Sequence, residues 1–139
     1  MKRKYAIVLT NLVFIIAGCS KNTDTSGIVP LNGRWNLVNV SGGFAGINED
    51  FEEGTIVWNF EAATGTLTIE NNNTSDALYD GLPSGSYQYS ILTDDKNLFL
   101  YIDNRESGAI FTSLGEIVLD QNVLSNGNGA DLFVLTLRK

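Results

Sequence analysis

Residues 31–139 predict an all-β domain, and two observations support this fold class. No segment after Leu31 repeats apolar residues at helical spacing for three turns, whereas the period-two alternation of strands recurs along the chain. Short connections at 63–65 and 94–97 contain turn-forming residues, and such short links join antiparallel neighbours. The expected strands cover residues 34–40, 55–60, 66–70, 86–92, 97–102, 109–114, 116–120 and 132–138.

About eight antiparallel up-and-down strands favour a closed barrel, because closure leaves no strand edge exposed. A two-sheet β-sandwich built from the same strands is the alternative. The strand 55–60 shows the pattern, since Ile56, Trp58 and Phe60 fall on one face. Two connections are long, at 41–54 and 71–85, and the first is expected to fold over the barrel as a lid.

The first 30 residues differ in character from the rest of the chain. Lys2, Arg3 and Lys4 precede a short apolar run at 6–17, which is typical of a secretory signal peptide. The sequence therefore divides into a signal peptide at 1–18, a polar tether at 19–30 and the barrel domain at 31–139.

The segment Ile16-Ala17-Gly18-Cys19 resembles the lipobox of bacterial lipoproteins at every position. The resemblance implies cleavage between Gly18 and Cys19, and acylation of Cys19 with fatty acids such as palmitate. Ser20 follows the cysteine, which in this family indicates the outer membrane, on its periplasmic face or at the cell surface. An ordinary signal peptide followed by a free thiol is the alternative. Several acyl chains anchor a protein stably without spanning the bilayer.

The segment LNGRWNLV, residues 31–38, opens the first strand with Gly33-x-Trp35. This resembles the lipocalins, and more closely the short lipocalin-like lipoproteins of Bacteroidetes bacteria. The resemblance implies that Trp35 closes one end of the barrel and that Arg138 of the last strand packs across its indole. The family's Thr-Asp-Tyr motif is missing, and residues 112–115 read Thr-Ser-Leu-Gly near that place.

Composition argues against catalysis and against nucleic-acid binding. The chain has no histidine, which excludes Ser-His and Cys-His nucleophile pairs, and its one cysteine excludes an intrachain disulfide. Cleavage after residue 18 removes three of nine basic and none of sixteen acidic residues, so the net charge changes from −7 to −10. Such a charge disfavours nucleic acid. We expect a monomer that is not an enzyme and has no cofactor and no metal site. The glycine-rich segment 126–134 resembles one calcium-binding nonapeptide but reads better as a hairpin loop.

Aromatic residues are the candidates for a pocket lining inside the barrel. They are Trp58, Phe60, Tyr87, Tyr89, Tyr101, Phe111 and Phe133. The first functional hypothesis is a lipid-anchored cell-envelope lipoprotein that binds a small apolar ligand. In the alternative, side chains fill the barrel and the lipoprotein contacts an envelope protein. The expected partners are thus the membrane, through acylated Cys19, and either the ligand or that protein.

Overall fold

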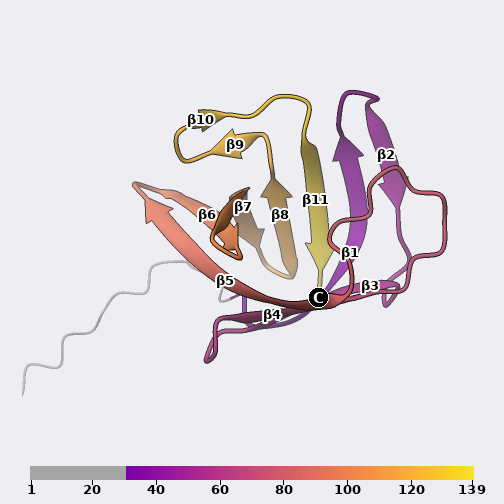
Figure 1. Cartoon of the computed structure of the whole chain (residues 1–139), viewed down its shortest axis with the longest axis horizontal. Helices are drawn as coiled ribbons and strands as arrows, with labels where there is room; N and C mark the ends of the chain where they lie inside the picture. Colours follow the sequence, from indigo (N-terminus) through magenta and orange to yellow (C-terminus); the bar gives the residue numbers. More distant parts are fainter. Residues whose placement is uncertain (1–30) are drawn as a thin grey trace, which may run out of the picture.

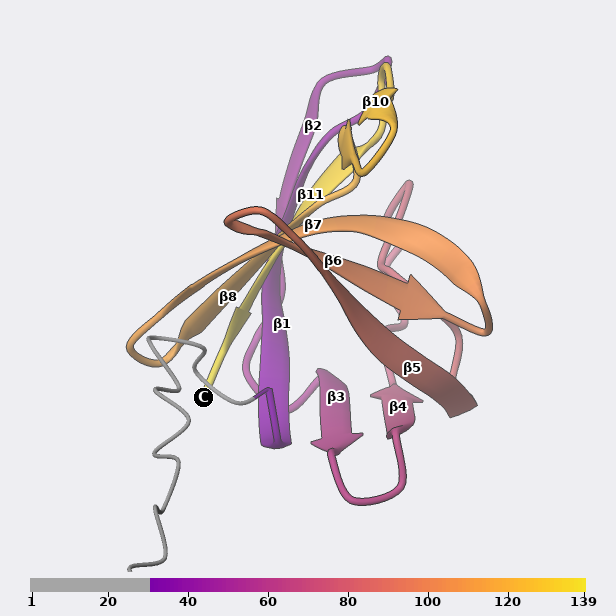
Figure 2. The same ribbon diagram turned by 90° about the vertical axis from the view of Figure 1, so that its left-hand side faces the viewer.

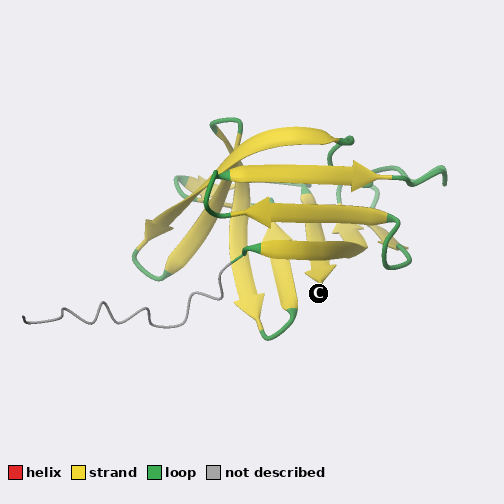
Figure 3. Ribbon diagram, turned by 90° about the horizontal axis from the view of Figure 1, so that it is seen from below, coloured by secondary structure: helices red, strands yellow, loops and turns green. Residues whose placement is uncertain are grey.

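A computed structural model describes residues 31–139, and this part of the chain is all β (Figure 3). The predicted signal peptide, Cys19 and the tether lie outside the described residues. The strands are β1 (Gly33–Gly42), β2 (Ile47–Asp50), β3 (Ile56–Glu61), β4 (Thr66–Asn71), β5 (Gly85–Asp94), β6 (Asn97–Ile102), β7 (Arg105–Ser113), β8 (Glu116–Asp120), β9 (Val123–Leu124), β10 (Gly127–Asn128) and β11 (Phe133–Arg138).

Eight antiparallel strands form a closed barrel, as the sequence predicts (Figures 1 and 2). The sheet order is β11-β8-β7-β6-β5-β4-β3-β1-β2, and β11 also pairs with β1. In that closing pair Leu37 lies opposite Leu137 and Val40 opposite Leu135. Closure excludes the sandwich, and β2 extends the sheet beside the C-terminal half of β1.

The core follows from the alternation of side chains along each strand. In β3, Trp58 and Phe60 are buried while Asn59 and Glu61 face solvent. Apolar side chains from the strands fill the interior, and no polar or charged residue is buried in the described part. This burial is the main source of the barrel's stability.

Because neighbouring strands alternate in direction, their connections gather at two ends. We call the loop end the side with the connections 43–55, 72–84, 103–104 and 121–132. We call the turn end the side with the connections 62–65, 95–96 and 114–115, where β1 begins and β11 ends.

The strand β7 begins earlier than the sequence predicts. Asp103 and Asn104 have φ angles of 48° and 62°, so they form the tight two-residue turn typical of a hairpin. A bulge follows, since Leu100 lies opposite Gly108 and Tyr101 opposite Glu106. Residues 105–108, which lie between the expected strands 97–102 and 109–114, therefore belong to β7.

The predicted lid at 41–54 is wrong. Its first part forms a hairpin between β1 and β2 that extends from the barrel at the loop end (Figure 2). Phe44 at the tip is 93% exposed, while Ile47 and Phe51 pack against the core. The segment forms a hairpin because β3 pairs only with residues 33–36 of β1. The same edge of β1 is therefore unpaired further along, and β2 pairs with it at residues 39–42.

Candidate functional site

Trp35 lies buried toward the turn end, which agrees with the lipocalin-like expectation for its burial. Its side chain is 0% exposed, and its indole Nε1 donates a hydrogen bond to the Leu31 carbonyl over 2.7 Å. Gly33, two residues earlier, begins β1 with a φ of 107°, a conformation that favours glycine.

The expected stacking of Arg138 on Trp35 is wrong. Arg138 pairs instead with Glu116, whose Oε2 lies 3.1 Å from its Nε. Leu137 points into the core, so the next residue on the strand points outward. Lys139 provides the cation instead, and its Nζ lies 5.0 Å from the centroid of the Trp35 ring.

The predicted pocket-lining aromatics divide into inner and outer groups. Trp58 and Phe60 are buried in the core, and Tyr89 meets Phe60 edge-on with the ring centroids 5.1 Å apart. Tyr87, Tyr89 and Phe133 are partly buried against the same core. Phe111 is 50% exposed, so its place in the lining is wrong. It follows Ile110, which takes the inward position.

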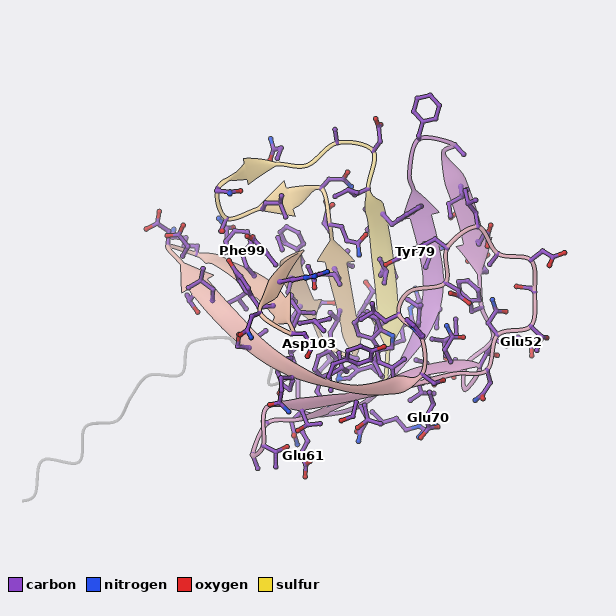
Figure 4. The ribbon with its side chains drawn as sticks, viewed as in Figure 1. Glu52, Glu61, Glu70, Tyr79, Phe99 and Asp103 are labelled. Carbon is purple, nitrogen blue, oxygen red and sulfur yellow. The ribbon has the colours of Figure 1, made fainter. Side chains whose placement is uncertain are left out.

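Tyr101 is also outside the core, in a network that fastens the β9–β10 hairpin to the barrel wall. The Glu106 carboxylate accepts hydrogen bonds from the Ser125 backbone N–H over 2.5 Å, from its hydroxyl over 2.9 Å and from the Tyr101 hydroxyl over 3.1 Å. Partial burial alone would raise the pKa of Glu106, but these three donors outweigh it and lower the pKa. Phe99 is buried beside this hairpin (Figure 4).

The loop 72–84, rather than the predicted lid, covers the interior at the loop end. Gly81 is so close to the core that a Cβ there would lie 3.4 Å from Leu37 and 3.6 Å from Trp58. Tyr79 of the loop, labelled in Figure 4, stacks on Phe133 of β11. The ring centroids are 4.2 Å apart. The loop therefore packs on side chains from both sides of the barrel seam.

Polar contacts hold the same loop at its base. The Asn71 side chain donates to the carbonyls of Asp80 and Leu82 over 3.5 and 3.4 Å. Ser84 Oγ accepts from the backbone N–H of Asn71 over 2.8 Å, and the Tyr87 hydroxyl donates to the Pro83 carbonyl over 2.8 Å. These contacts tie the second half of the loop to the end of β4 and to the start of β5.

A hollow of ≈ 490 Å³ opens between this loop and the β6–β7 turn. It has an apolar part made by Leu82, Tyr87 and Ile102 and a polar part made by Asp103, Arg105 and Ser107. A second, more open hollow of ≈ 320 Å³ lies against the loop and is lined by Asn71, Asn73, Asp80, Gly81, Pro83 and Ser84. Only the first has aromatic and aliphatic side chains on its wall together with both an acidic and a basic residue.

Tyr87 is the one member of the predicted pocket lining that borders the larger hollow. The sequence interpretation missed the other residues that line this hollow. Leu82 stands in a loop without periodicity. Asp103 lies in a tight turn and Arg105 directly after it, where charged residues are ordinarily solvated. Trp58 lies deeper, beside Gly81, and its indole N–H has no hydrogen-bond partner among the described residues.

Among residues 31–139, no three or more acidic side chains gather in a way that could hold a metal ion. No helix in this part of the chain could cross a membrane. Comparison of the chain with protein families, curated proteins and solved structures gives no match.

Proposed function

We propose that this chain is a lipid-anchored, non-enzymatic, lipocalin-like binding module of the cell envelope that takes a small apolar ligand at the loop end of its barrel. The observation that supports binding is the hollow of ≈ 490 Å³ with Leu82, Tyr87 and Ile102 on its wall. Small-molecule sites typically enclose about 300–1,000 Å³ and are largely apolar. Aromatic and aliphatic side chains fill the rest of the interior, so a ligand would bind at the mouth and beneath the loop.

The proposed anchor rests on Ile16-Ala17-Gly18-Cys19 and its resemblance to the lipobox. Acylated Cys19 would hold the domain on the outer membrane, with Ser20 as the sorting signal. A net charge of −10 after cleavage gives the body no attraction to anionic lipid, so the acyl chains would provide the attachment.

Binding can be tested with the neutral apolar fluorophore N-phenyl-1-naphthylamine and the protein in nanodiscs, with empty nanodiscs as the background. We expect saturable binding that Leu82→Ser weakens at least about fivefold, because a fully buried leucine contributes about 1.5–3 kcal/mol. Leu78→Ser is the matched control, since Leu78 lies in the same loop but is 64% exposed. Absence of saturable binding, or an equal loss in both variants, would contradict the proposal.

A second candidate, contact with an envelope protein, is favoured by Phe44. This side chain is 93% exposed at the β1–β2 tip. Neighbouring Gly43 donates its N–H to the carbonyl of Leu132, so a second partly exposed apolar residue lies close to this tip. A photo-crosslinking residue at position 44 should then trap one defined envelope protein in cells. The same residue at position 114, where Leu114 is fully exposed at the turn end, should not trap that protein.

A further inference from the structure

Two opposite charges border the larger hollow at the β6–β7 turn. Asp103 is the first residue of the turn, and Arg105 is the first residue of β7. The ion pairs in the described part of the chain are Arg34–Glu70 and Arg138–Glu116, so Asp103 and Arg105 pair neither with each other nor with another charge there.

Two hydrogen bonds to the backbone of Gln88 hold Asp103, which is labelled in Figure 4. Its N–H donates to the Gln88 carbonyl over 2.8 Å, and its Oδ1 accepts from the Gln88 N–H over 2.9 Å. Oδ1 is therefore committed to β5, while Oδ2 has no hydrogen bond among the described residues. The carboxylate is a fixed acceptor with one oxygen free.

Arg105 is positioned just as firmly at its backbone. It lies opposite Ile102 in the β6–β7 ladder, and Ile102 belongs to the apolar wall of the hollow. Arg105 is exposed and lines the hollow next to its apolar wall, and arginine is well suited to bind carboxylates.

We propose that the hollow binds a zwitterion with an apolar body, of the α-amino acid type. The ligand's ammonium would lie at Asp103, its carboxylate at Arg105 and its apolar part against Leu82, Tyr87 and Ile102. A ligand with one charge meets a like charge as well as an opposite one, whereas a zwitterion is complementary to both. This inference rests on the proposed function, because it names the chemical class of the ligand for that site.

Four probes with related alkyl chains test the inference by calorimetric titration: 2-aminooctanoate, octanoate, octylammonium and 1-octanol. We expect 2-aminooctanoate to bind at least about fourfold more tightly than 1-octanol. Each exposed charge pair contributes about two- to fivefold in affinity. Arg105→Gln and Asp103→Asn should each weaken 2-aminooctanoate by about two- to fivefold and leave 1-octanol unchanged.

The variants have matched controls elsewhere on the barrel. Arg34→Gln and Glu70→Gln make the same changes of charge in an exposed ion pair between β1 and β4. They should leave every probe's affinity unchanged. Asn at 103 keeps the acceptor for Gln88 and tolerates the φ of 48°, so the fold is retained.

The outcomes separate the two proposals. If 1-octanol binds as tightly as 2-aminooctanoate, or if the Arg105 and Asp103 variants behave like their controls, the zwitterion assignment is overturned while apolar binding stands. Tighter binding of octanoate or octylammonium than of 2-aminooctanoate would also overturn it. If no probe binds, the proposed function itself fails.

Discussion

The ammonium group of Lys139 lies 5.0 Å from the centroid of the Trp35 indole ring, where it caps the buried aromatic from the solvent side. The ring's N–H is satisfied separately, by the Leu31 carbonyl. The Lys139 backbone N–H also donates to the Gly115 carbonyl over 3.1 Å, so the residue is held in place. The turn end is therefore closed by segments from both ends of the described chain and by the β7–β8 turn.

Lys139→Gln should change the fluorescence of Trp35, because it removes the cation from the indole face. In a Trp58→Phe background Trp35 is the only tryptophan, so its emission maximum and quantum yield report directly on this contact. Arg138→Gln is the control and should leave the emission unaltered, since Arg138 pairs with Glu116. If Arg138→Gln changed the emission of Trp35 and Lys139→Gln did not, the cation on the indole would be Arg138 rather than Lys139.

Trp35→Phe should destabilise the barrel more than Trp58→Phe, by about 1 kcal/mol or more. Both replacements remove the same atoms from the core. The first leaves the Leu31 carbonyl without its donor, whereas the second removes an N–H that has no partner among the described residues. Urea unfolding at neutral pH measures the difference, and equal losses would mean that the Leu31 bond contributes little.

Gly108→Ala should destabilise by at least about 3 kcal/mol. A Cβ at position 108 would lie 2.3 Å from the Asp120 carbonyl oxygen, and the φ of 133° is strained for any other residue. Gly46→Ala is the control, because its φ is 61° but nothing lies within 4 Å of the added atom. It should cost about 1–2 kcal/mol. Similar unfolding free energies for the two variants would show that β8 can move away.

Glu106→Gln should loosen the β9–β10 hairpin, because an amide accepts the three donors more weakly and brings its own NH₂ group. The pKa of Glu106 is lowered from 4.5, so its stabilising effect is complete above the unfolded-state pKa and is lost as pH falls through the folded value. The stability difference between wild type and variant should therefore shrink as pH decreases below about 4.5.

Hydrogen exchange of the amides in 121–132 should accelerate in the same variant. Glu116→Gln, which alters only the exposed pair with Arg138, should leave those amides unaffected. A pH-independent difference, or unchanged exchange, would contradict the role of Glu106.

Cys19→Ala should abolish lipidation while the barrel still folds, since residues 31–139 form a closed barrel of their own. Mass spectrometry of the native protein should find acyl chains on an amino-terminal Cys19, and the variant should leave the membrane fraction. A native protein that begins at another residue, or lacks acyl chains, would refute the anchor.

Local patterns in the sequence predict much of the fold. Strands β6 and β8 match the expected ranges 97–102 and 116–120, and the tight connections at 63–65 and 95–96 are where turn residues indicate them. Alternation and turn chemistry depend on near neighbours, so one sequence is enough to detect them. The short elements β2, β9 and β10 were missed because two to four residues show no periodicity.

The direction of a side chain is harder to predict where two large apolar residues are adjacent. Ile110 and Phe111 satisfy the strand pattern in either phase, and the bulge at Ser107 sets the phase in which Ile110 points inward. The role expected of Arg138 at Trp35 belongs to Lys139 instead, because the inward direction of Leu137 turns Arg138 outward.

The sequence alone thus determined the all-β class and the positions of the longer strands, because these follow from periodicity and turn chemistry, while the burial of Trp35 was implied by the Gly33-x-Trp35 resemblance. Tertiary structure decided three other features: the register of the closing pair of β1 and β11, the choice of 72–84 over 41–54 as the covering loop, and the meeting of Leu82 with Asp103 and Arg105 at one hollow. These depend on contacts between segments far apart in the chain, and no local pattern records which segments meet.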